Sequence, residues 1–226
     1  MIIIPILHGL NLSHSYGRRG KGRHMSELYG SLYADLEPKR YGKKATTNDA
    51  PRERWGIGMA FEEMLEAGLS ARVFNENPAE QIMRPGEFET LHTEDCSKPK
   101  ERRTYGCGCV CGGGVLFTPD LIIDNGHTRV GEIKLNSMSA KGAPHKLGET
   151  YSGLDSKFDK YICQLQAYCL HVGTPFARLY MFSMREMVNF NEPGIFRSWD
   201  IEFTPHELRE NWEWLRVHGV QKGLLI

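Results

Sequence analysis

The chain has 226 residues, of which 40% are hydrophobic and 25% charged, and its 28 basic residues balance its 28 acidic residues. These proportions are those of a soluble globular protein, and the length suits one domain with a full core. No apolar run approaches the roughly 20 residues that cross a membrane, and the apolar start of the chain lacks the basic flank of a signal peptide. We therefore expect a single domain, residues 1–226, that is cytoplasmic and has no membrane partner.

The balanced charge hides an asymmetry along the chain. Residues 1–54 hold ten basic and five acidic side chains, so this region has a net charge of +5 and the remainder has −5. A basic region suits a phosphate backbone, although an ordinary solvated surface has the same composition. Within it, a loop rich in glycine, serine and basic residues precedes a short helix predicted from Ser26.

The next predicted helix is better marked. Asp49 can cap its start and Pro51 suits its first turn, and the pattern runs to about residue 68. Glu62 and Glu66 are one turn apart on the same stripe of this helix.

The middle of the chain alternates between strands and irregular segments. Residues 71–93 are predicted to form short strands, and a Cys/Gly-rich insertion follows at about 94–114. Strands are then expected at about 115–124 and 128–135. A polar loop over 136–155 is long enough to be functional rather than a simple connection.

The last part of the chain predicts a helix, two strands and a final helix. The first helix starts at Ser156 and ends near Gly173, and buried strands follow in FARLYMFSM and RSWDIEF. Thr204 is expected to cap the last helix, with Glu207 at the capping-box position. This order of elements predicts a mixed α/β fold.

Two short motifs carry the chemistry. Pro119-Asp120 is followed twelve residues later by Glu132-Ile133-Lys134. Residues i and i+2 of a strand point to the same face, so Glu132 and Lys134 should stand side by side. Two carboxylates converging on a strand pair suit Mg²⁺, and an adjacent lysine can orient water and stabilise charge on a phosphate.

The turn between the motifs decides whether they can meet. Asn125-Gly126 is a strong hairpin signal, but a two-residue loop would put Asp120 and Glu132 on opposite faces. A metal site needs both on one face. We therefore predict a three-residue turn, 124–126, with Gly126 left-handed in a G1 bulge.

In chain order these motifs resemble those of the PD-(D/E)xK nuclease superfamily, and more closely its RecB-like exonuclease branch. The matching segments are GMAFE at 58–62, PD at 119–120, EIK at 132–134 and QLQAY at 164–168. The resemblance implies a restriction-endonuclease-like core, with a central mixed β-sheet flanked by helices.

The resemblance also implies a Mg²⁺- or Mn²⁺-dependent nuclease acting on DNA. The small size is similar to that of stand-alone nucleases of phages and mobile elements, so the leading expectation is an exonuclease of phage-like DNA recombination or repair. Such an enzyme would act in the host cytoplasm if phage-encoded. Its partner would be a second copy of the chain or a recombination or replication protein. A structure-specific or restriction-type endonuclease and an inactive DNA-binding protein are the alternatives. The implied metal ligands are Glu62, Asp120, Glu132 and the carbonyl of Ile133. The implied catalytic residues are Asp120, Glu132 and Lys134. The resemblance also implies that Gln164, Tyr168 and Glu66 contact DNA or support the site.

Four cysteines precede Asp120 and can hold Zn²⁺ or an iron–sulfur cluster: Cys96, Cys107, Cys109 and Cys111. Some RecB-like relatives carry a [4Fe–4S] cluster, but three of its four cysteines follow the Gln-x-x-x-Tyr helix. The present chain departs from that pattern, so we favour a glycine-rich loop with incidental thiols. Cys163 and Cys169 are expected to pack within their helix.

Overall fold

The computed structural model describes residues 23–36, 38, 60–61, 64, 81–83, 88–89, 99, 115–124, 126–136, 159–183 and 195–225. The apolar start of the chain, the predicted helix start at Ser156 and most of the insertion and of the 136–155 loop lie outside these residues.

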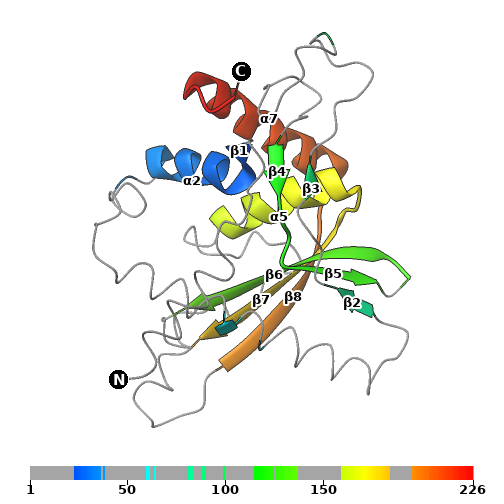
Figure 1. Ribbon diagram of the computed structural model, residues 1–226. Helices are drawn as coiled ribbons and strands as arrows, with labels where there is room; N and C mark the ends of the chain where they lie inside the picture. The colour runs from blue at the N-terminus through cyan, green and yellow to red at the C-terminus, as the bar shows by residue number, and fades with distance from the viewer. Residues whose placement is uncertain are drawn as a thin grey trace, which may run out of the picture.

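The centre of the fold is a five-stranded mixed sheet in the order β2-β5-β6-β7-β8 (Figure 1). Strands β6 and β7 are parallel, whereas the other neighbours are antiparallel. A parallel pair needs a crossover connection, and helix α5 lies on the one that joins β6 to β7. The strands are β2 Gln81–Met83, β5 Leu121–Asp124, β6 Thr128–Asn136, β7 Phe176–Ser183 and β8 Ile195–Glu202.

A second, smaller sheet has the order β1-β4-β3. Its strands are β1 Arg23–His24, β4 Val115–Phe117 and β3 Phe88–Glu89. Strand β4 was predicted to be continuous with β5, as one strand over 115–124. That prediction is wrong, because the chain leaves the small sheet at Phe117 and enters the large one at Leu121.

Three helices cover one face of the large sheet: α2 Met25–Leu36, α5 Asp159–Val172 and α7 Pro205–Gln221 (Figure 1). The main core lies between them and includes Val130, Leu165, Leu179 and Leu215. Val130 shows that the even-numbered residues of β6 face the helices. The predicted mixed α/β fold with a helix-flanked sheet is confirmed. No helix within the described ranges is long and apolar enough to span a membrane.

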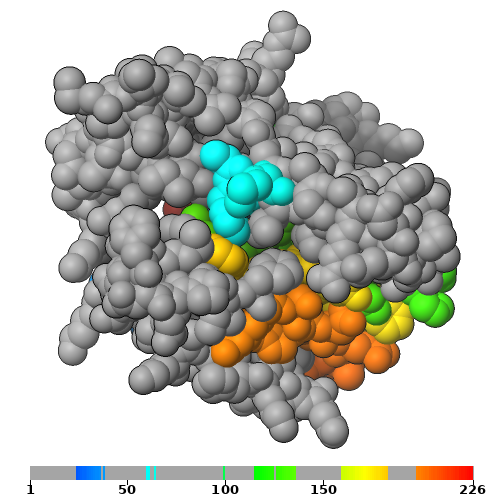
Figure 2. Space-filling model, turned by 90° about the horizontal axis from the view of Figure 1, so that it is seen from below, coloured from blue at the N-terminus to red at the C-terminus, as the bar shows by residue number. Residues whose placement is uncertain are grey.

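The opposite face of the sheet carries a smaller apolar cluster of Leu121, Ile123, Ile133 and Tyr180. Figure 2 views the molecule from this side, with β8 in orange. The ring of Phe61 lies 4.7 Å from that of Phe182 between centroids. Residue 61 therefore reaches the sheet at the end of β7.

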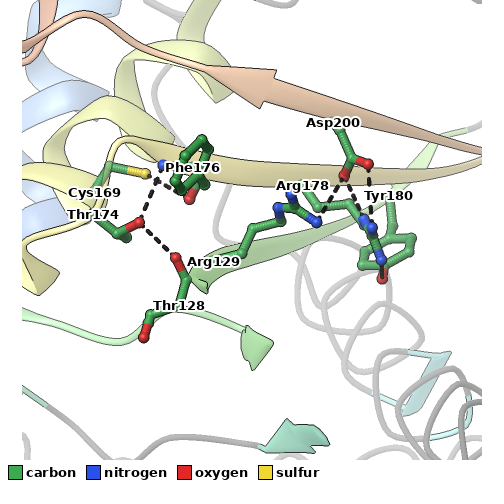
Figure 3. A network of polar contacts seen from close by, with 8 residues as sticks. All are labelled: Thr128, Arg129, Cys169, Thr174, Phe176, Arg178, Tyr180 and Asp200. Carbon is green, nitrogen blue, oxygen red and sulfur yellow. Dashed lines mark hydrogen bonds and ion pairs between the residues drawn. The ribbon is translucent and has the colours of Figure 1, made fainter. Parts of the chain in front are cut away.

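A polar network also lies on this face, toward the start of β7 and the end of β8 (Figure 3). Arg178 donates to both oxygens of Asp200, at 2.6 and 3.2 Å, and Arg129 approaches the same carboxylate at 3.6 Å. Arg178 also donates to the hydroxyl of Tyr180 at 3.4 Å. This network ties three neighbouring strands together on the side away from the helices.

The predicted start of α7 is confirmed. The hydroxyl of Thr204 accepts a hydrogen bond from the backbone N–H of Glu207 at 3.2 Å, and the Glu207 carboxylate accepts from the Thr204 N–H at 2.7 Å. Helix α5 ends, as expected, before Gly173, which has φ +82°.

Near its end, α5 places His171 in an aromatic environment. Its ring lies edge-on to Trp212 at 4.6 Å and 5.8 Å from Phe117 between centroids. Its Nε2 is buried and has no hydrogen-bond partner among the described residues. Burial lowers the pKa of His171 from 6.5 to about 4.

His171 should therefore make the fold acid-sensitive. Between pH 6.5 and pH 4 the unfolded chain binds a proton at this position and the folded chain does not, so stability falls as the pH falls. Between pH 7 and pH 4.5, the wild-type protein should lose about 2 kcal/mol more of its unfolding free energy than His171→Phe does. Urea denaturation of both proteins at the two pH values measures this difference, and equal losses would contradict it.

Candidate active site

Asp120 occupies the break between the two sheets. It forms a bend immediately before β5, rather than a position within a strand as predicted. The preceding residue, Pro119, is buried and has no backbone N–H to donate to a ladder, which explains why strand pairing stops there. The Asp120 side chain consequently lies at the open end of β5, beside the uncovered edge of β6.

The register of β5 and β6 brings the two predicted carboxylates together. Asp124 pairs with Thr128 and Leu121 pairs with Gly131. Asp120 precedes Leu121, so it lies opposite Glu132, and both belong to the same face of the pair. The prediction that Asp120 and Glu132 share one face of the strand pair is confirmed.

The turn itself differs from the prediction by one residue. The connection spans 125–127 rather than 124–126, because Asp124 still pairs within the ladder. Its Oδ1 accepts a hydrogen bond from the N–H of Gly126 at 3.1 Å, an arrangement that closes the turn from the end of the strand. Gly126 has φ +92°, the positive value that was predicted.

Asp120 binds directly to the backbone of the second motif. Its Oδ2 accepts a hydrogen bond from the N–H of Ile133 at 2.7 Å, in the place of a ladder partner. The N–H and C=O of one residue in an extended strand point to the same side, so the carbonyl of Ile133 faces the same edge. Asp120 and the Ile133 carbonyl are thus neighbours.

Glu132 is the buried centre of the site, with 1% of its surface exposed. Lys134 donates to its Oε1, and Gln164 of α5 donates to the same oxygen at 2.5 Å. The Gln164 amide also donates to the hydroxyl of Tyr168 at 3.1 Å. A buried carboxylate needs such partners, since burying a charge without them is costly.

The electrostatics of Lys134 follow from this arrangement. Burial lowers the pKa of Lys134, but the Glu132 and Asp120 carboxylates outweigh this effect and place its pKa above the ordinary value. The Lys134 side chain therefore carries its proton and forms an ion pair with Glu132. Tyr168 is almost fully buried, and burial is the main cause that raises its pKa.

Tyr29 of α2 is a member of the site that the sequence did not reveal. Only 8% of its surface is exposed. Burial raises the pKa of Tyr29, Lys134 opposes the rise, and the carboxylates of Glu132 and Asp120 add to it. The Tyr29 side chain is therefore within electrostatic reach of Asp120, Glu132 and Lys134. The sequence of α2 has no motif that marks this position.

The first turn of α5 adds two further side chains. The Nζ of Lys134 lies 5.5 Å from the ring centroid of Tyr161, and the Nζ of Lys160 lies 5.4 Å from that of Tyr29. The helical spacing of Tyr161, three residues before Gln164, was a signal for its position. Lys160 lies four residues before Gln164 on the same helix, but nothing in the sequence marked its contact with Tyr29.

The donor set fits a divalent cation of the hard class. Asp120, Glu132 and the carbonyl of Ile133 supply only oxygen atoms, the ligands that Mg²⁺ and Mn²⁺ prefer. Within the described part of the chain, no group of three or more His, Cys, Asp or Glu residues could hold a metal ion. The remaining predicted ligands and supporting acids lie outside the described residues: Glu62, Glu66, Cys96, Cys107, Cys109 and Cys111.

No protein-family model matches the sequence, and neither does any curated protein. Among solved structures, SSO0001 is similar over 98% of this chain and 87% of its own, with a TM-score of 0.53 and 13% identity. The alkaline exonuclease LHK-Exo from Laribacter hongkongensis is similar over 90% of this chain and 89% of its own, with 14% identity. Its TM-scores are 0.47 for the complex with dAMP and 0.45 for a second structure. At such low identity, the match to SSO0001 indicates a shared fold.

Proposed function

We propose that this protein is a metal-dependent deoxyribonuclease that hydrolyses phosphodiester bonds. The observation that supports it most directly is the register of β5 and β6, which sets Asp120 opposite Glu132 with Lys134 on the Glu132 carboxylate. The motif spacing alone allowed these carboxylates to face apart. Their convergence matches the requirement of the nuclease motifs that the sequence resembles.

In this proposal Asp120, Glu132 and the Ile133 carbonyl would hold Mg²⁺ or Mn²⁺, and Glu62 would supply a further carboxylate. Such an ion, when bound, lowers the pKa of water and neutralises charge on a phosphate. Lys134, which Glu132 holds in place, donates hydrogen bonds to the attacking water or to a phosphate oxygen.

Gln164 and Tyr168 act as supports for Glu132. Both are buried, with 6% and 1% of their surfaces exposed, and the Gln164 amide connects the Tyr168 hydroxyl to the Glu132 carboxylate. A side chain enclosed in this way orients its neighbour rather than touching DNA.

We infer an exonuclease of phage-like DNA recombination or repair, with an endonuclease and an inactive DNA-binding protein as alternatives. The test is incubation with linear duplex, linear single-stranded and closed-circular DNA, with Mg²⁺, with Mn²⁺ or with EDTA. Degradation of linear DNA alone, abolished by EDTA, supports an exonuclease, because an exonuclease needs an end. Cleavage of the closed circle would indicate an endonuclease, and binding without cleavage would indicate the inactive alternative.

A further inference from the structure

We propose that Lys160, held against the ring of Tyr29, is a contact for the phosphate backbone of the nucleic acid beside the carboxylate pair. This inference rests on the proposed nuclease function. It adds a binding residue that is outside the motifs on which that function is based.

The position of Lys160 on α5 points toward the site. Lys160 precedes Gln164 by four residues, so the two lie on the same face of the helix, one turn apart. Gln164 reaches the Glu132 carboxylate at 2.5 Å. One turn of helix is about 6 Å, and a strand of B-form DNA advances about 3.4 Å per phosphate along its axis. Lys160 thus lies one helical turn, or the length of one to two phosphates, from the residue that contacts the Glu132 carboxylate.

The ring of Tyr29 holds the Lys160 ammonium at the interface between α2 and α5. The Nζ lies 5.4 Å from the ring centroid, and the ring belongs to α2, which packs against α5. The negative face of a tyrosine ring attracts an ammonium placed over it. Two helices from distant parts of the sequence therefore hold one cation at the edge of the site.

The Lys160 ammonium lies near a second cation, Lys134, and a bound anion would offset the repulsion between them. Burial lowers the pKa of Lys160, and the neighbouring cation of Lys134 lowers it further. The Lys134 cation therefore opposes the charge of Lys160, whereas Lys134 itself is paired with the Glu132 carboxylate. A phosphate backbone would offset this repulsion, and each lysine that neutralises a phosphate releases a counterion.

The alternative is that Lys160 only packs its aliphatic stem on Tyr29. The salt dependence of binding separates the two roles, since a packing residue does not change the number of counterions released. A labelled blunt-ended duplex is titrated with the full-length protein in Ca²⁺ at several salt concentrations. We expect Lys160→Ala to weaken binding roughly five-fold and to reduce the slope of log affinity against log salt by about 1. Lys160→Arg should retain the slope.

Lys222→Ala provides the matched control. Lys222 pairs with Asp35 at 2.6 Å, and both side chains are close to half exposed. This variant removes the same charge from the surface and should leave the slope unchanged.

Tyr29→Leu tests the supporting role of the ring. It should weaken binding in the wild-type background and have no further effect in the Lys160→Ala background, because the two residues act through one contact. Thermal unfolding of each variant checks that it folds. If Tyr29→Leu does not fold, the Lys160 variants decide the question alone.

An unchanged slope and affinity in Lys160→Ala would overturn the inference. If the wild-type protein cleaves DNA and only this result fails, the nuclease proposal stands and the phosphate contact is rejected. If the wild-type protein neither binds nor cleaves DNA, both proposals are rejected.

Discussion

Replacing Lys134 with methionine should destabilise the metal-free protein by about 2 kcal/mol. Methionine keeps much of the side-chain volume but removes the cation from Glu132, which is only 1% exposed. Losing one partner of a fully buried pair costs about 3–5 kcal/mol. The cost here should be smaller, because 20% of the Lys134 side chain is exposed and Gln164 still donates to the carboxylate. Chemical denaturation in EDTA measures the change.

Removing the negative charge as well should restore most of the lost stability. Glutamine is close in shape to glutamate and carries no charge. The double variant Lys134→Met with Glu132→Gln therefore leaves no buried charge and should be more stable than Lys134→Met alone. Lys222→Met is the control, since it breaks an exposed ion pair with Asp35 and should change stability little. If Lys134→Met were as mild as Lys222→Met, Glu132 would not be an anion in the folded protein. Both Lys134 variants should also lose cleavage.

The face that each motif residue occupies could be predicted because a strand alternates strictly. If Asp120 and Glu132 are required to bind the same metal ion, the only strand registers left are those that put both side chains on one face. The exact turn could not be predicted in the same way. It depends on whether Asp124 stays in the ladder, and the hydrogen bond from Gly126 to its side chain decides this locally.

The break between β4 and β5 illustrates a different limit. Val115–Phe117 before the proline and Leu121 and Ile123 after it are apolar and buried, so the pattern 115–124 looks like one strand. Their periodicity does not show that the two halves pair with different sheets. The proline was the signal for an interruption, and its meaning depended on tertiary partners.

The contact between Tyr29 and Lys160 lies beyond what the sequence could reveal. They are separated by more than a hundred residues, and their contact depends on how α2 and α5 pack over the sheet. Motif spacing relates Lys160 to Gln164 on the same helix, but it cannot show which residue of another helix Lys160 meets. The role of Glu62 remains a prediction, as does that of Glu66.

Replacing Asp120 with asparagine should abolish cleavage while preserving the fold. The amide oxygen of asparagine can still accept the hydrogen bond from the N–H of Ile133, which the carboxylate now accepts at 2.7 Å. The substitution removes one of the two described anionic ligands that we assign to the metal, and a hard divalent cation binds poorly without such charge. We expect the initial rate on linear DNA in Mg²⁺ to fall by at least about 10³-fold, with little change in urea denaturation without metal.

Asp200→Asn is the matched control for this experiment. Asp200 lies on the opposite face of the sheet, where Arg178 and Arg129 hold its carboxylate (Figure 3). The same chemical change there should leave cleavage near the wild-type rate and affect only stability. Added Mg²⁺ should raise the unfolding temperature of the wild-type protein and of Asp200→Asn, because a ligand of the native state stabilises it, but not that of Asp120→Asn. Equal rates in the two variants, together with equal stabilisation by Mg²⁺, would exclude Asp120 as a metal ligand and with it the proposed active site.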